Sequence, residues 1–183
     1  MNNLAVQYME MGSYDKAEPL HLQARDLRKK LLGENHPAYA TSLNNLARLY
    51  KEMGSSAKAE PLYLQARDLR KKLLGENHPA YATSLNNLAA LYKDMGSYDK
   101  AEPLYLHARD LRKKLLGENH PLYALSLNNL AVLYQAMGSY DKAEPLYLQA
   151  RDLRGSSWGE PSPLCPSFPL RTRQATSRCC TWR

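Results

Sequence analysis

The feature that most constrains this chain is a block of 42 residues that recurs along most of its length. One complete copy, residues 43–84, reads LNNLARLYKEMGSSAKAEPLYLQARDLRKKLLGENHPAYATS. Its glycine recurs as Gly12, Gly54, Gly96 and Gly138. A fixed period of this size is typical of stacked repeat arrays, in which each unit packs on its neighbours, and it argues against a single globular core.

Each unit contains two helical patterns on either side of its glycine. Leu43, Leu46 and Tyr50 share one face of a first helix, and residues 59–73 carry a second such face. The predicted helices cover residues 14–32, 38–53, 56–74, 80–95, 98–116, 122–137 and 140–154, after a partial first helix at the N-terminus. The pattern therefore predicts eight helices in antiparallel pairs.

Cap residues mark where these helices begin and end. We expect Ser55 to cap the second helix and Gly75 to end it. Pro79 suits the first turn of the next helix, where its missing N–H is not needed. Pro61 conflicts with the pattern, because it removes one backbone hydrogen bond inside the second helix, and we expect the helix to tolerate it with a slight bend.

The packing residues of this unit resemble those of the tetratricopeptide repeat. The matching positions are Leu43, Leu46, Ala47, Tyr50, Gly54, Ala59, Tyr63 and Ala66. The 42-residue period, the LNNLA and AEPLY runs and the GENHP junction are similar to the long repeat of kinesin light chains and of nephrocystin-3-like proteins. The resemblance implies an all-α fold, a right-handed α-solenoid of antiparallel helix pairs, and a role in protein binding.

The chain divides into two parts. Residues 1–154 form the repeat array of about four units, the first of them truncated, and we interpret the array as a piece of a longer one or as a truncated product. Residues 155–183 are rich in Pro, Ser, Arg and Cys without helical period, which predicts a disordered tail. A sharper hypothesis is a fifth repeat read out of frame, because codons for Gly-Ser-Ser-Trp-Gly, shifted by two bases, can spell the junction sequence Lys-Leu-Leu-Gly.

Composition narrows the class of protein further. The net charge is +7, of which the tail carries +3, so the repeats hold only a mild excess of +4 and make no case for nucleic acid. There is neither a signal peptide nor an apolar run long enough to span a membrane. The repeats contain no cysteine, which fits a cytoplasmic protein.

No catalytic, cofactor or metal site is predicted. Glu34 and His36 of the GENHP junction recur in each unit, but successive copies are a whole repeat apart, so we interpret the histidine as part of a helix start. His21 and His107 occupy positions that vary between units. The tail cysteines Cys165, Cys179 and Cys180 match no zinc spacing. We therefore expect a protein that is not an enzyme.

The candidate site lies on the other face of the first helix, which lines the concave groove in tetratricopeptide arrays. The predicted groove residues are Asn44, Arg48, Lys51, Asn86, Lys93, Asn128 and Gln135, with Asn2 at the start of the same row. An amide both donates and accepts, so this row can pair with the backbone of an extended peptide. The neighbouring Asn45 row, Asn3, Asn45, Asn87 and Asn129, is the alternative one for bonds between adjacent helices.

A second basic row ends each second helix. In one unit it contains four cations, Arg67, Arg70, Lys71 and Lys72, and one anion, Asp68. Asp68 is spaced for an ion pair with Lys72. An acidic partner or a membrane surface is one interpretation of this row. The other, which we favour, is a solvated convex face, since cations favour a helix C-terminus.

The predicted function is a scaffold or adaptor that binds a short, acidic peptide in the concave groove. The resemblance to kinesin light chains adds an aromatic anchor to that peptide, although the heptads that would join a motor are missing here. The alternative is a structural spacer that stacks on itself through its uncapped ends. Nucleic acid and membrane are not among the expected partners.

The tail is predicted to be dispensable for folding. Residues 155–183 contribute no repeat-spaced apolar side chains, so a chain ending at Arg154 should keep its helicity and melting temperature. Circular dichroism during a thermal scan measures both. A clear drop in melting temperature in the shortened chain would show instead that the tail docks on the array.

Overall fold

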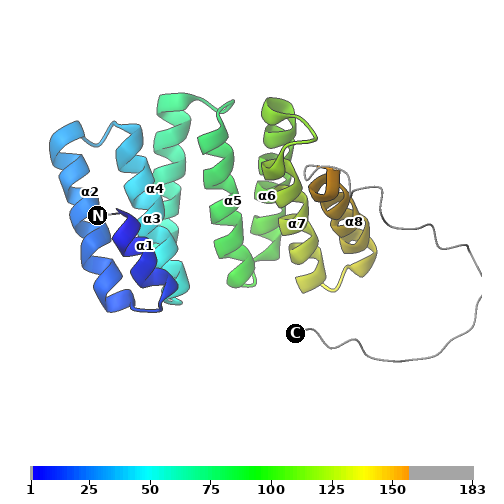
Figure 1. The fold of residues 1–183 in the computed structure, drawn as a ribbon, viewed down its shortest axis with the longest axis horizontal. Helices are drawn as coiled ribbons and strands as arrows, with labels where there is room; N and C mark the ends of the chain where they lie inside the picture. The colour runs from blue at the N-terminus through cyan, green and yellow to red at the C-terminus, as the bar shows by residue number, and fades with distance from the viewer. Residues whose placement is uncertain (1, 157–183) are drawn as a thin grey trace, which may run out of the picture.

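The computed structural model describes residues 2–156, and these residues form eight α-helices (Figure 1). The helices are α1 (Asn2–Glu10), α2 (Tyr14–Leu32), α3 (Pro37–Glu52), α4 (Ser56–Leu74), α5 (Pro79–Asp94), α6 (Tyr98–Leu116), α7 (Pro121–Ala136) and α8 (Tyr140–Ser156). They pack in antiparallel pairs, α1 with α2 through α7 with α8. The predicted all-α array of helix pairs is confirmed.

The predicted helix limits agree closely with the observed ones. Helices α2, α4 and α6 begin and end at the predicted residues, and α3, α5 and α7 lie one residue earlier than predicted. Helix α8 runs to Ser156, and the predictions for the rest of the tail fall on residues 157–183, outside the described residues. Helix α4 continues through Pro61, as expected.

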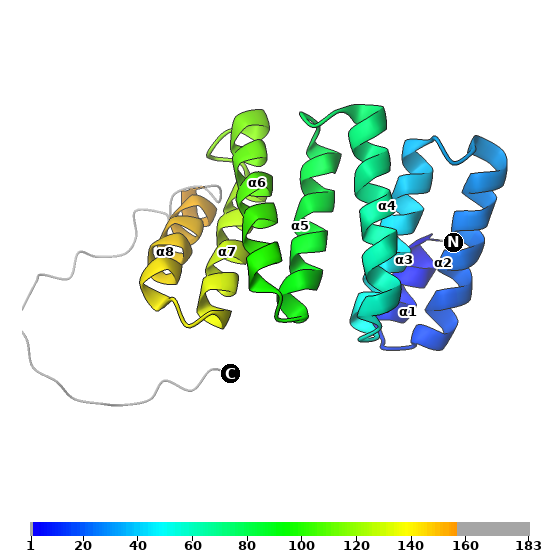
Figure 2. The same cartoon turned by 180° about the vertical axis from the view of Figure 1, so that it is seen from behind.

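The helices form two layers. The first helices of the units, α1, α3, α5 and α7, lie toward the viewer in Figure 1, and the second helices are seen from the other side in Figure 2. Helix α3 also contacts α5, and α5 contacts α7. Because first helices of successive units reach each other, their layer is the more closely spaced one and forms the inner face of the array.

Each first helix ends in a tight turn at the repeated glycine. Gly54 has a φ of 71°, a left-handed conformation that a Cβ disfavours. There its N–H donates to the Lys51 carbonyl at 2.9 Å, and the Ser55 N–H donates to the Tyr50 carbonyl at 2.8 Å. The turn therefore provides hydrogen-bond donors for the last carbonyl groups of the helix before the chain reverses direction.

The cap of the second helix differs from the prediction in one respect. Ser55 occupies the N-cap position, but its side chain makes no capping hydrogen bond. The backbone begins the helix instead, since the Ser55 carbonyl accepts from Ala59 N–H at 3.1 Å. The predicted end at Gly75 and the predicted start of the next helix at Pro79 are both confirmed.

Small residues allow the two helices of a unit to approach closely. Ala47, Ala59 and Ala66 are fully buried, and Tyr63 fills the space beside them with 2% of its surface exposed. The apolar stripe predicted for both helices is therefore the core. Ala89, the counterpart of Ala47, is also fully buried, whereas the next residue, Ala90, is only half-buried.

These two neighbouring alanines give a direct test of the helix orientation. Ala89→Leu should lower the free energy of unfolding by about 1–3 kcal/mol, because extra methylenes overfill a packed core. Ala90→Leu is the matched control and should change it by less than about 0.5 kcal/mol. Urea unfolding followed by circular dichroism compares the two, and equal losses would mean that the inward face of α5 is assigned wrongly.

Candidate functional site

The predicted groove residues all lie on the first helices, in the inner layer. Asn44 and Asn86 are each only 8% exposed. The half-buried members of the set are Arg48, Lys51, Lys93 and Asn128, while Gln135 is exposed. The set thus lies in one layer of helices, but its two central amides are more deeply placed than a freely accessible row would be.

The amides of adjacent units form a hydrogen-bonded ladder. Asn87 Nδ2 donates to Asn44 Oδ1 at 2.9 Å, and Asn129 Nδ2 donates to Asn86 Oδ1 at 2.8 Å. The expectation that the Asn45 row bonds to a neighbouring helix is confirmed for two of its members, Asn87 and Asn129. Its partners are members of the predicted groove row, so the carbonyl oxygens of Asn44 and Asn86 already hold successive units together.

The two groove lysines converge on one carboxylate. Lys51 Nζ lies 2.7 Å from Asp94 Oδ2, and Lys93 Nζ lies 3.1 Å from Asp94 Oδ1. Burial alone would raise the pKa of Asp94, but hydrogen bonds and the positive charges of the two lysines lower it. Asp94 therefore stays ionised and neutralises much of the positive charge predicted for the groove.

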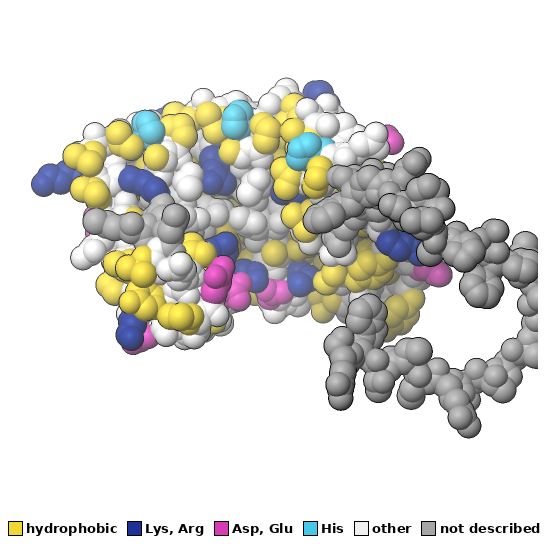
Figure 3. Space-filling view, in the orientation of Figure 1, with side chains coloured by type: hydrophobic (Ala, Val, Ile, Leu, Met, Phe, Trp, Pro, Cys, Tyr) yellow, Lys and Arg dark blue, Asp and Glu magenta, His cyan; other side chains and the backbone are white. Residues whose placement is uncertain are grey.

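Sequence reasoning missed these carboxylates. Glu52 and Asp94 directly follow Lys51 and Lys93, and Lys51 Nζ also lies 3.6 Å from Glu52 Oε1. The space-filling view shows acidic and basic side chains side by side on this face (Figure 3). The signal was present, because Glu10 and Glu52 are one repeat period apart and Asp94 follows after another, so the groove is a mixed-charge surface.

Arg48 differs from the lysines because it lacks a compensating partner. It lines a hollow of about 230 Å³ between the first two units, together with Met9, Glu10, Tyr14 and Glu52. The Nε atom of Arg48 is buried and has no hydrogen-bond partner among the described residues, where no ion pair of this guanidinium occurs either. Arg48 is thus the groove cation most available to a ligand.

A buried histidine lies close to Arg48. His21 occupies the position of Tyr63 and Tyr105 in later units and is 2% exposed, so it is part of the core and not a freely variable surface position. Its Nε2 has no partner among the described residues. Burial and the charge of Arg48 both lower the pKa of His21, so its imidazole is neutral at pH 7. The other variable histidine, His107, is exposed and packs edge-on against Tyr81.

The second basic row is only in part the solvated face that its sequence suggested, because Lys71 and Lys72 are exposed but the arginine between the helices is not. Arg70 is only 6% exposed, and its Nη1 donates to Ser84 Oγ at 2.9 Å and to the Ala80 carbonyl at 3.3 Å. Arg112 makes the same contacts one unit later. Because a buried guanidinium needs partners, this arginine joins the second helix of one unit to the first helix of the next.

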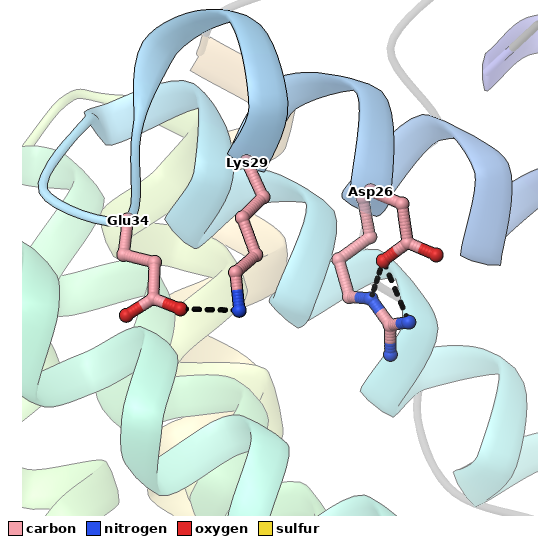
Figure 4. A network of polar contacts seen from close by, with 4 residues as sticks. Asp26, Lys29 and Glu34 are labelled. Atoms are coloured by element: carbon pink, nitrogen blue, oxygen red, sulfur yellow. Dashed lines mark hydrogen bonds and ion pairs between the residues drawn. The ribbon is translucent and has the colours of Figure 1, made fainter.

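The exposed part of that row also pairs differently from the prediction. Asp68 accepts from its neighbour Arg67 at 2.8 Å, whereas Lys72 donates to Asn35 of the preceding junction at 3.4 Å. The predicted Asp68–Lys72 ion pair is therefore wrong. Adjacent Arg and Asp side chains meet in the same way at Arg25 and Asp26 (Figure 4).

The GENHP junction uses its charged residues locally. Glu34 accepts from Lys29 at 2.5 Å, as Figure 4 shows, and the later junctions repeat this pair. His36 is the N-cap of α3, since its Nδ1 accepts from Ala38 N–H at 3.1 Å. The interpretation of this histidine as a helix start is confirmed. In residues 2–156 no three His, Cys, Asp or Glu side chains gather so as to hold a metal ion.

The hydropathy of the helices bears on the membrane question. Across the described part of the chain, no helix combines the length and apolar character that a membrane span requires.

Comparison with known proteins identifies the family to which this architecture belongs. The array of helix pairs defines a helical-repeat protein, and the tetratricopeptide repeat model matches residues 1–72, 53–114 and 81–156. The chain belongs to the tetratricopeptide repeat family, whose members typically act as non-catalytic scaffolds. A search of curated proteins finds no match.

Two solved structures show the same arrangement. BtubC (BKLC) from P. vanneervenii is 28% identical with a TM-score of 0.75, over 94% of this chain and 69% of that one. A candidate kinesin light chain with nearly identical TPR-like repeats, from Podospora anserina, is 24% identical with a TM-score of 0.56, over 87% and 95%. The chain is therefore similar in structure to kinesin light chain-like repeat proteins.

The buried arginine of the second helix can be tested against its exposed neighbour. Arg70→Ala should lower the free energy of unfolding by about 1.5–3 kcal/mol, because it removes charge-assisted hydrogen bonds between α4 and α5. Lys71→Ala, which breaks only an exposed ion pair, should leave the free energy of unfolding nearly unchanged. Urea unfolding measures both, and a harmless Arg70→Ala would rule out the guanidinium as a junction element.

Proposed function

We propose that this protein is an interaction module that holds an extended, acidic peptide along the inner face of the array. Family membership supports protein partners in general. The inner face supplies a continuous surface, since the first helices of successive units contact each other. Residues recurring at one position of these helices lie in rows along it, which suits the repeating backbone of an extended chain.

The observation that carries the acidic preference is the uncompensated Arg48. An arginine fork binds a carboxylate through two parallel hydrogen bonds, and a half-buried site strengthens them. The hollow of about 230 Å³ beside Arg48 leaves room for such a side chain. Lys51 and Lys93 contribute less, because Asp94 already pairs with both. Glu10 and Glu52 line the same hollow and repel an entering carboxylate, so that carboxylate must bond the guanidinium directly to offset their charge.

Only part of the hydrogen-bonding capacity of the amide row is available to a peptide backbone. Asn44 and Asn86 use their carbonyl oxygens in the ladder, so their Nδ2 groups are what remains for a peptide carbonyl. Asn128 is more exposed and offers both of its functions at the far end. Half-buried Val6, Ala90 and Val132 lie between these polar positions and suit apolar side chains. This pattern favours a peptide with an acidic residue beside Arg48 and apolar or aromatic residues on either side of it.

The role proposed here is adaptor-like binding, and the kinesin light chain-like relatives support it through their architecture. Cysteine-free repeats are compatible with action in the cytoplasm. We assign no catalytic activity to the groove. Its lysines pair with a carboxylate of the protein, and Arg48 remains available to bind a ligand.

A peptide titration tests the acidic preference. The probe is a labelled peptide with glutamates flanking a tryptophan, compared with the same peptide carrying glutamines. Arg48→Ala should weaken binding of the glutamate peptide by about 10- to 100-fold, the equivalent of about 1.5–3 kcal/mol, and flatten its salt dependence. Fluorescence anisotropy at two salt concentrations provides both quantities.

The chain offers matched controls for this titration. Alanine already stands at position 90 and valine at positions 6 and 132, so the fold accepts a small residue in place of Arg48. Lys72→Ala removes an equal charge from the outer layer and should leave affinity unchanged. Arg70 is unsuitable as a control, because it is buried. If Lys72→Ala loses binding while Arg48→Ala keeps it, the groove is not the site.

A further inference from the structure

Every junction between units is closed by the same polar pair. A tyrosine hydroxyl of the later unit donates to a glutamate of the preceding second helix. The pairs are Tyr50 with Glu18, Tyr92 with Glu60 and Tyr134 with Glu102, each at 2.8 Å. Burial raises the pKa of Tyr134 to about 12, with the hydrogen bond to Glu102 adding to the shift, so the phenol remains a donor across the physiological range.

The two ends of the array carry the unmatched halves of this pair. Tyr8 is the counterpart of Tyr50 in α1, and Glu144 is the counterpart of Glu102 in α8. Glu18, Glu60 and Glu102 are half-buried, whereas Glu144 is exposed. Neither Tyr8 nor Glu144 has its junction partner within residues 2–156. The donor at one end is therefore complementary to the acceptor at the other.

Apolar side chains at both ends are uncovered in the same way. Leu4 is 46% exposed, although its counterparts Leu46, Leu88 and Leu130 are at most 1% exposed. On α8, Leu148 is 43% exposed and Tyr147 is only half-buried, whereas Tyr105 at the same position in the preceding unit is 2% exposed. In the interior, the first helix of the next unit covers this surface, as α7 covers α6.

A hollow marks the place on α8 where such a helix would lie. It has a volume of about 300 Å³ and is lined by Gln135, Tyr140, Ala143, Glu144, Tyr147 and Leu148. Its tyrosines and its leucine are more exposed than their counterparts Tyr98, Tyr105 and Leu106 in the preceding unit, and its one carboxylate is the open member of the tyrosine–glutamate series. The shape and chemistry of this end therefore continue the internal junctions.

We propose that the occupant of this surface is a second copy of the chain, joined head to tail. Helix α1 of one copy packs on α8 of the next as α7 packs on α6, and the Tyr8 hydroxyl donates to Glu144. The two surfaces are different, so the contact is heterologous and adds further copies in one direction. Of the predicted groove residues only Gln135 lines this hollow, and Arg48 lines a different one at the first junction, so failure of the contact would leave the proposed peptide binding at Arg48 untouched.

Two features make this contact weaker than an internal junction. Helix α1 has 9 residues, whereas α3, α5 and α7 have 16. Gln7 is exposed at the position where Leu49, Leu91 and Leu133 are fully buried. Burying a polar amide there costs free energy that leucine does not. We therefore expect reversible association that grows with protein concentration.

Blocking each end separately tests the head-to-tail arrangement. Leu4→Glu places a charge on the α1 surface, and Leu148→Glu places one on the α8 surface. Both leucines are already exposed, so the variants should fold, as circular dichroism can verify. In sedimentation velocity the unmodified chain should form growing oligomers, each variant alone should stay monomeric, and an equimolar mixture should form a dimer through the two unblocked ends.

The outcomes separate this proposal from its alternatives. If Leu4→Glu alone still dimerises, copies associate through their α8 ends. If Leu148→Glu alone does so, they associate through their α1 ends. If the unmodified chain remains monomeric at all concentrations, a second copy is not the occupant. Each of these results overturns the head-to-tail assignment.

Finer substitutions test the residues named in the contact. Tyr8→Phe should weaken association about three- to tenfold through loss of one hydrogen bond. Gln7→Leu restores the residue of the internal junctions and should strengthen association. Asp152→Asn, which removes a carboxylate elsewhere on α8, is the matched control and should change nothing. Unchanged association in both Tyr8→Phe and Gln7→Leu would exclude α1 from the contact.

Discussion

The structure depends on the packing of each first helix against the second helix of the unit before it. This contact buries Tyr63 and Tyr105 and holds Arg70 and Arg112 against the hydroxyls of Ser84 and Ser126. A unit has too little core to bury these residues alone, so a neighbour is needed before either the tyrosine or the guanidinium leaves water. The same contact sets the spacing of the first helices, and with it the geometry of the inner face.

Residues whose environment is decided within one unit could be predicted from the sequence. The buried alanines, the left-handed glycine and the histidine beside proline all act over a few residues or across one helix pair, and helical periodicity is enough to find them. Ser55 was placed correctly at a helix start, but its side chain makes no cap hydrogen bond, because the preceding turn and the backbone already begin the helix.

Residues whose partners lie in the next unit could not be predicted in the same way. From its position on the helix, Arg70 is expected to face solvent. It is buried only because α5 packs against α4. Asn44 is likewise half of a pair whose other half is 43 residues away. In the groove, Lys51 and Lys93 share Asp94, which lies on the helix of Lys93 and on the helix adjacent to that of Lys51. Periodicity within one helix contains no information about such neighbours.

Because the units are nearly identical, the few positions at which they differ are informative. Units two and three differ at only seven positions, so most of the surface repeats and cannot distinguish one place along the array from another. Specific recognition must come from residues that break the repeat. Arg48 with His21 does so at the first junction, where a histidine replaces the tyrosine of later units and an arginine is left without a counterion. Gln7 does so at the end of the array, where one amide replaces a buried leucine. The repeated residues thus build a uniform scaffold, and these few departures from it are the residues on which the proposed peptide binding and the proposed head-to-tail contact depend.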